Sequence, residues 1–145
     1  MSRRIVVPLD GSELSEQAVE TAADLLDREG TLILIRVLEF PQIGVWAPID
    51  AVVAHQEEEK MVRTYLAGLK EKWTGRGFAV ETQMHPGPSP AHAVVDTADK
   101  EKADLIVMSS HGRTGFAHFM LGSVAEKVVR LCHTPIYILK PTVQK

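Results

Sequence analysis

The fold is decided by residues 107–124, which read VMSSHGRTGFAHFMLGSV. This stretch begins as an apolar strand, passes through a loop containing Gly112 and Gly115, and ends where helical spacing begins. Ser123 is placed to cap that helix, and Glu126, three residues on, would complete a capping box. A helix N-terminus presents unpaired N–H groups and a partial positive charge, and glycines before it let an anion approach the backbone. The stretch therefore predicts a phosphate site.

The totals narrow the class of protein. A chain of 145 residues suggests one domain, over residues 1–145. The net charge of −3 argues against nucleic-acid binding, which needs a basic surface, but it allows one local anion site. Cys132 is the single cysteine, so no internal disulfide forms and a reducing compartment is favoured. No apolar run is long enough to span a membrane or to act as a signal peptide, so we expect a cytoplasmic protein.

Outward from residues 107–124, apolar strands alternate with helical patterns. We expect strands at residues 3–9, 31–38, 78–84, 104–108 and 136–139, with Pro8 at or past the end of the first. Predicted N-caps are Ser12, Asp50 and Ser89, and Gly30 is the predicted C′ residue of the first helix. The second helix should bury Val62, Tyr65, Leu66, Leu69 and Trp73. The third strand alternates, which favours a place at the sheet edge.

This alternation predicts an α/β fold, a doubly wound five-stranded parallel sheet of order 3-2-1-4-5 with four main helices. In such sheets the ligand lies beyond the carboxyl ends of the strands, where the winding reverses. That point falls between the first and fourth strands, so Asp10 should face the loop after Ser109. Asp10 suits ribose hydroxyls, or it forms only the turn before Gly11. No Walker motif and no G-x-G-x-x-G fingerprint occurs.

Several segments resemble the universal stress protein family. They are SHGRTG and GSVAEKV, with nine residues between Gly112 and Gly122, together with IVVPLDGS near the start and TPIYILK near the end. The resemblance covers essentially the whole chain. It implies the same sheet order, a fold similar to the adenine nucleotide alpha-hydrolases, and a homodimer through the last strand, Ile136 to Leu139. In one branch of the family it also implies bound ATP or AMP, with or without Mg²⁺.

The family pattern assigns roles to individual positions. It implies phosphate binding by Gly112, Gly122 and Ser123, and ribose binding by Asp10. Leu9 and Val37 would pack near adenine. The full set of candidate nucleotide-binding residues is Pro8, Leu9, Asp10, Val37, Met108, Ser109, Gly112, Arg113, Gly122, Ser123 and Val124. Ser109 replaces the first glycine of the motif, close to the ribose, where its side chain would either weaken binding or add a hydrogen bond.

The predicted function is that of an ATP- or AMP-binding universal stress protein acting as a regulatory stress-response module. The alternative is a member of the non-nucleotide branch acting through protein interactions, and slow ATP hydrolysis is a third reading. We do not expect a dedicated enzyme, because the chain lacks G-x-S-x-G and a clear general base. The six histidines show no metal-ligand spacing. His111 is expected to orient its loop through backbone bonds, and Cys132 to be a packed thiol.

Overall fold

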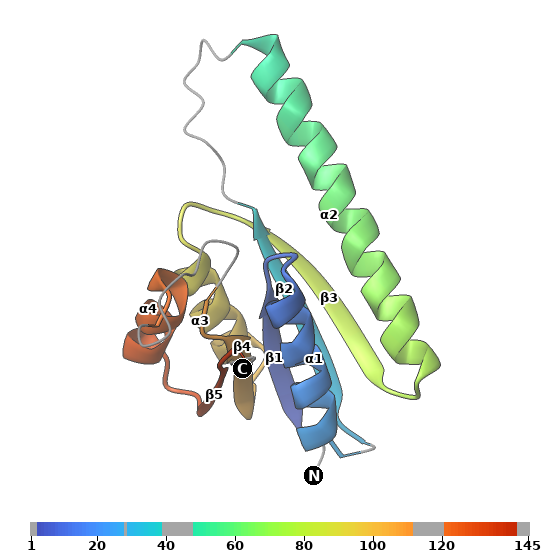
Figure 1. Ribbon diagram of the computed structural model, residues 1–145, viewed down its shortest axis with the longest axis vertical. Helices are drawn as coiled ribbons and strands as arrows, with labels where there is room; N and C mark the ends of the chain where they lie inside the picture. The colour runs from blue at the N-terminus through green and yellow to red at the C-terminus, as the bar shows by residue number, and fades with distance from the viewer. Residues whose placement is uncertain (1–2, 28, 39–47, 112–120, 142–145) are drawn as a thin grey trace.

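The computed structural model describes residues 3–27, 29–38, 48–111 and 121–141. Its five strands form one parallel sheet with helices on both faces (Figure 1). The strands are β1 (Arg4–Leu9), β2 (Thr31–Leu38), β3 (Ala79–Pro86), β4 (Leu105–Ser109) and β5 (Ile136–Leu139). The helices are α1 (Glu13–Leu25), α2 (Ile49–Gly75), α3 (Pro90–Lys100) and α4 (Ser123–Leu131). The strand order is β3-β2-β1-β4-β5, so the predicted doubly wound sheet is confirmed, with β3 at one edge.

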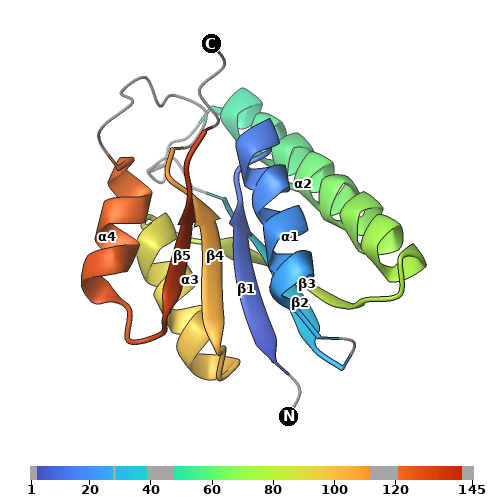
Figure 2. The same cartoon turned by 60° about the horizontal axis from the view of Figure 1, so that its bottom comes forward.

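Strand alternation divides the core into two layers. Figure 2 shows α1 and α2 on one side of the sheet and α3 and α4 on the other. The α1/α2 side packs against Ile5 and Val7 of β1, whereas the α3/α4 side packs against Val6. The same alternation places Leu34 and Ile35 of β2 on opposite sides. Any residue near the carboxyl end of a strand is thereby assigned to one face.

The long helix α2 is buried along the predicted stripe only in its C-terminal half. Val62, Leu66, Leu69 and Trp73 are buried there, and Tyr65 packs partly against the same cluster. Trp73 meets Phe78 edge-on, with ring centroids 5.7 Å apart. The N-terminal half of α2 extends past the sheet (Figure 1). Within the described residues, no helix is both long and apolar enough to cross a membrane.

Among the ends of α1, α2 and α3, two of the predicted N-caps are confirmed and two predictions are wrong. The hydroxyls of Ser12 and Ser89 accept the N–H groups that a cap should accept. The N-cap of α2 is Pro48, so Asp50 lies inside the first turn and caps nothing. Gly30 is not a C′ residue, because α1 ends at Leu25. A Cβ at Gly30 would lie 2.8 Å from the Arg3 carbonyl oxygen, so close packing against β1 requires the glycine.

Pro8 lies within β1 rather than past its end. The Arg3 carbonyl accepts from Thr31 on the β2 side, and the Arg4 carbonyl accepts from Asp104 on the β4 side. Alternation then turns the backbone of Pro8 toward β4. The registered pairing of β1 with β4 ends at Val6, so the N–H that proline lacks leaves no ladder bond unmade.

Candidate functional site

The point where the sheet winding reverses lies between the carboxyl ends of β1 and β4. Registered pairs join Ile5 to Leu105 and Val6 to Ile106, and pairing stops before either strand ends. Asp10 follows β1 directly, and Ser109 ends β4. The unpaired ends of these two strands therefore define the place where a ligand of a doubly wound sheet sits.

Asp10 serves the turn between β1 and α1. Its Oδ1 accepts the Ser12 N–H at 2.9 Å, and Gly11 has a φ of +87°, which favours glycine. The backbone N–H of Asp10 donates to Ser15 Oγ at 3.4 Å. Among the described residues, no hydrogen bond uses the second carboxylate oxygen, Oδ2. The turn-forming role is thus present, and one charged acceptor is left for a ligand.

Helix α4 begins at Ser123, and its N-cap is Gly122. Gly122 is extended, with φ −62° and ψ 159°, and its carbonyl accepts the Glu126 N–H at 2.9 Å. The N-cap Gly122 has no side chain, so the predicted capping box is wrong: the Glu126 carboxylate accepts from Arg130 at 2.6 Å instead. Ser123 is exposed in the first turn. Within the described residues, no side-chain cap takes the first N–H groups of α4, as an anion site requires.

Gly122 joins α4 to the end of β4. Its N–H donates to the Ser110 carbonyl at 2.6 Å, and Ser110 donates in turn to the Leu139 carbonyl of β5 at 2.8 Å. A Cβ on Gly122 would lie 2.8 Å from that same Ser110 oxygen. The Gly122 N–H already donates to Ser110, so it is not available to an anion. What the glycine provides is the close approach of α4 to the end of β4, and the N–H groups for an anion must come from the first turn of the helix.

The His111 side chain contacts the neighbouring Ser110, whereas most of the loop that it was predicted to orient lies outside the described residues. Its Nδ1 lies 2.9 Å from the hydroxyl of Ser110, which is only 2% exposed. Its Nε2 is buried and has no hydrogen-bond partner among the described residues. Gly112, Arg113 and Gly115, which the sequence also placed in this loop, lie outside the described residues. Ser110 was missed by sequence reasoning, since an interior serine beside a glycine loop carries no distinguishing pattern.

The apolar candidates divide between the two faces of the sheet. Met108 and Val124 belong to the α3/α4 side, and Val37 follows Ile33 and Ile35 on that side by alternation. Leu9 instead follows Val7 into the core beneath α1 and α2, where it is 5% exposed. The side chain of Leu9 is therefore not brought together with Val37.

A charged group on the α1/α2 side adjoins Asp10. The Arg36 guanidinium lies over the Tyr65 ring, 5.2 Å from its centroid. Burial, together with the negative charge of Glu16, raises the pKa of Tyr65 to about 12, so this phenol is neutral at physiological pH. Sequence reasoning missed this group, although Arg36 interrupting an apolar strand was an available signal. Among the described residues, no group of three or more His, Cys, Asp or Glu is placed to hold a metal.

The fold defines a class of protein, the doubly wound α/β domain, a class in which ligands bind at the switch point of the sheet. The family model described as "Universal stress protein family" matches residues 1–140. The chain belongs to the universal stress protein family. It is 32% identical to a universal stress protein of Methanocaldococcus jannaschii, MJ0531, over 95% of this chain and 82% of the relative.

Solved structures agree with this assignment. The structure of the protein MJ0577 superposes with a TM-score of 0.87 at 25% identity, covering 99% of each chain. A universal stress protein solved in complex with cAMP superposes with a TM-score of 0.70 at 26% identity, covering 96% of this chain and 97% of the other. The chain covers 43% of a Mycobacterium tuberculosis relative to which it is 32% identical, so the domain also occurs within longer chains.

Proposed function

We propose that this universal stress protein binds an adenine nucleotide, ATP or AMP, at the β1–β4 switch point and acts as a regulatory module. The observation that carries the proposal is the start of α4, where Gly122, an N-cap without a side chain, packs the first turn of the helix against the end of β4. The structure of a relative in complex with cAMP supports the nucleotide class. Dedicated catalysis is not part of the proposal, and cytoplasmic residence stays a prediction.

The proposed layout follows the strand order. The phosphates lie at the first turn of α4, beside β4, where Ser123 adds an exposed hydroxyl. The ribose lies at β1, where Asp10 Oδ2 accepts its hydroxyls. The base lies against Val37 of β2, on the α3/α4 side of the sheet. Each part of the nucleotide thereby meets a group whose chemistry suits it.

Ser109 fits this layout despite replacing the first motif glycine. Its side chain is 8% exposed, and alternation from Val107 turns it toward the α1/α2 side. The base is proposed on the opposite side, with Met108. The extra Cβ and hydroxyl therefore do not occupy the space proposed for adenine, and this supports binding in spite of the substitution.

Calorimetric titration of nucleotide-free protein with ATP tests the proposal, with AMP and Mg²⁺–ATP in parallel. Asp10→Asn retains an oxygen for the turn but replaces a charged acceptor with a neutral one. We expect it to weaken ATP binding about tenfold, because hydrogen bonds to charged groups are roughly twice as strong. Wild-type protein that releases no heat with any of these ligands would favour the interaction-module alternative.

The same proposal includes a homodimer through β5. This strand lies at the sheet edge, opposite β3 in the strand order. The carbonyls of Pro135 and Leu139 accept from Ile106 of β4 and from Ser110 just past its end, so alternation turns the backbone of Ile136 and Ile138 toward the free edge. Tyr137 is 43% exposed on this strand. An open apolar edge of this kind pairs readily with another strand, and a second copy offers the same edge.

Ile138→Pro should yield monomers, since proline removes an N–H that faces the free edge. Ile138 also packs against the α3/α4 core. Ile138→Ala is therefore the matched control, because it loses the packing and keeps the N–H. Sedimentation velocity should find dimers for the wild type and the alanine variant and monomers for the proline variant. Equal masses for the two variants would contradict pairing through this edge.

A further inference from the structure

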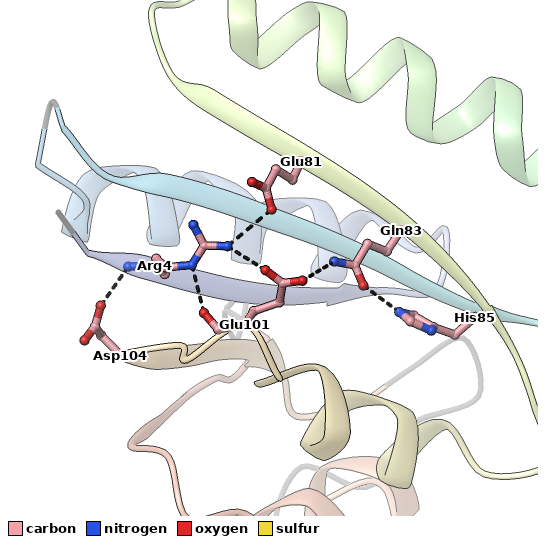
Figure 3. Close-up of polar contacts among 6 residues, drawn as sticks. All are labelled: Arg4, Glu81, Gln83, His85, Glu101 and Asp104. Carbon is pink, nitrogen blue, oxygen red and sulfur yellow. Dashed lines mark hydrogen bonds and ion pairs between the residues drawn. The ribbon is translucent and has the colours of Figure 1, made fainter. Parts of the chain in front are cut away.

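We propose that His85 selects the base, by presenting Nδ1 as a hydrogen-bond acceptor to the 6-amino group of adenine. This inference rests on the proposed nucleotide site and adds to it a residue that determines specificity. His85 lies near the carboxyl end of β3, at the end of a chain of polar contacts that begins at β1 (Figure 3). That chain fixes which ring nitrogen carries the proton.

The contacts set the direction of each hydrogen bond in turn. Arg4 pairs with one oxygen of the Glu101 carboxylate at 2.6 Å, and also with Glu81 at 3.3 Å. The other oxygen of Glu101 accepts Gln83 Nε2 at 3.0 Å, which orients the Gln83 amide. Gln83 Oε1 then lies 2.7 Å from His85 Nε2 (Figure 3). An amide oxygen only accepts, so His85 Nε2 must donate.

Thr97 leads to the same protonation of the ring. Its hydroxyl donates to the Ala93 carbonyl at 2.7 Å and is therefore left as an acceptor toward His85 Nε2, 3.3 Å away. Neutral imidazole carries one N–H, so Nδ1 is an unprotonated acceptor. Among the described residues, none forms a hydrogen bond with His85 Nδ1. The ring is half-buried and so combines a fixed tautomer with one unused acceptor.

Sheet register places His85 beside the proposed base position. Val37 and His85 are direct partners between β2 and β3. Partners in a parallel ladder project to the same face, and for Val37 this is the α3/α4 side. The order β4-β1-β2-β3 matches phosphate, ribose, base and His85, with strands about 4.8 Å apart. A base lying on Val37 therefore directs its outer edge toward β3.

The chemistry separates adenine from 6-oxopurines. Adenine presents an amino donor at position 6, whereas guanine presents an acceptor oxygen there, as does hypoxanthine. A fixed acceptor on the protein accepts a hydrogen bond from the amino group of adenine. Opposite a 6-oxopurine, the same acceptor faces another acceptor and no hydrogen bond forms. Inosine triphosphate loses the hydrogen bond that ATP makes and leaves an acceptor unpaired. We therefore expect a preference of roughly tenfold for ATP over inosine triphosphate.

The experiment compares ATP and inosine triphosphate by calorimetry on wild-type protein, His85→Leu and His133→Leu. His133 is exposed between α4 and β5, away from the proposed base position, and serves as the matched control. We expect the preference of roughly tenfold in the wild type and in His133→Leu. In His85→Leu the two ligands should bind almost equally, mainly because ATP binds more weakly.

If His85→Leu lowers the affinity for both ligands equally, His85 has only a structural role and the inference is overturned. A wild type that binds both ligands equally would overturn base selection alone, whereas one that binds neither would overturn the proposed function along with it. If His85→Leu does not fold, ¹⁵N NMR of the wild type decides. The His85 Nδ1 resonance should shift with ATP and not with inosine triphosphate, and identical responses would contradict the proposal.

Discussion

Gly122→Val is expected to lower the free energy of unfolding by about 3 kcal/mol and to abolish nucleotide binding. The new Cβ would lie 2.8 Å from the Ser110 carbonyl oxygen and 3.3 Å from His111 Cα. Both neighbours are backbone atoms, so they cannot move aside as a flexible side chain would. Displacing Gly122 also breaks its 2.6 Å hydrogen bond to Ser110 and moves the start of α4. The thermal unfolding temperature should fall by roughly 10 °C.

Gly87→Val provides the matched control for this prediction. A Cβ at Gly87 meets no atom within 4 Å, in the loop between β3 and α3. Its unfolding temperature and ATP affinity should stay close to those of the wild type. Scanning calorimetry and ligand titration on both variants separate the two effects. If Gly122→Val unfolds at the temperature of Gly87→Val, the close approach of α4 to β4 does not hold.

Ser123→Asp should change stability and binding in opposite directions. A carboxylate in the first turn of α4 interacts favourably with the helix N-terminus, by about 0.3–1 kcal/mol. The same carboxylate repels the phosphates of ATP at short range, which should weaken binding on the order of a hundredfold at low salt. The unfolding temperature would therefore rise slightly while the affinity for ATP falls.

Ser123→Asn is the neutral control, because asparagine has nearly the same shape as aspartate without its charge. The weaker ATP binding of the aspartate variant should recover partly as salt is added, since salt screens an exposed charge. Equal ATP affinity in the two variants would place the phosphates away from α4. That result would contradict the proposed layout and leave the fold unaffected.

Helix ends are where sequence reasoning was least accurate. Ser123, Asp50 and Gly30 each matched a local rule, yet α4 and α2 begin at other caps and Gly30 is kept for close packing. The position of a cap depends on where the chain leaves the sheet. At α4, the bond from Gly122 to Ser110 fixes that position, and it joins residues that are distant in sequence.

The candidate site shows the same division. The sequence was sufficient to place Asp10 after β1 and to bring it to the same edge as the end of β4, because parallel order puts these carboxyl ends together. It did not predict that Leu9 faces the α1/α2 core, nor that Ser110 anchors both His111 and Gly122. These facts depend on strand faces and on single backbone contacts.

By itself the sequence determined the strand and helix pattern, the order of the sheet, the buried stripe of α2 and the family, because each follows from the spacing of apolar residues or from a local motif. Only the tertiary structure decided how Gly122 packs the start of α4 against the end of β4, and how Arg4, Glu101 and Gln83 orient His85. Arg4 and Glu101 are 97 positions apart, and directed hydrogen bonds between such residues exist only once the sheet has brought them together.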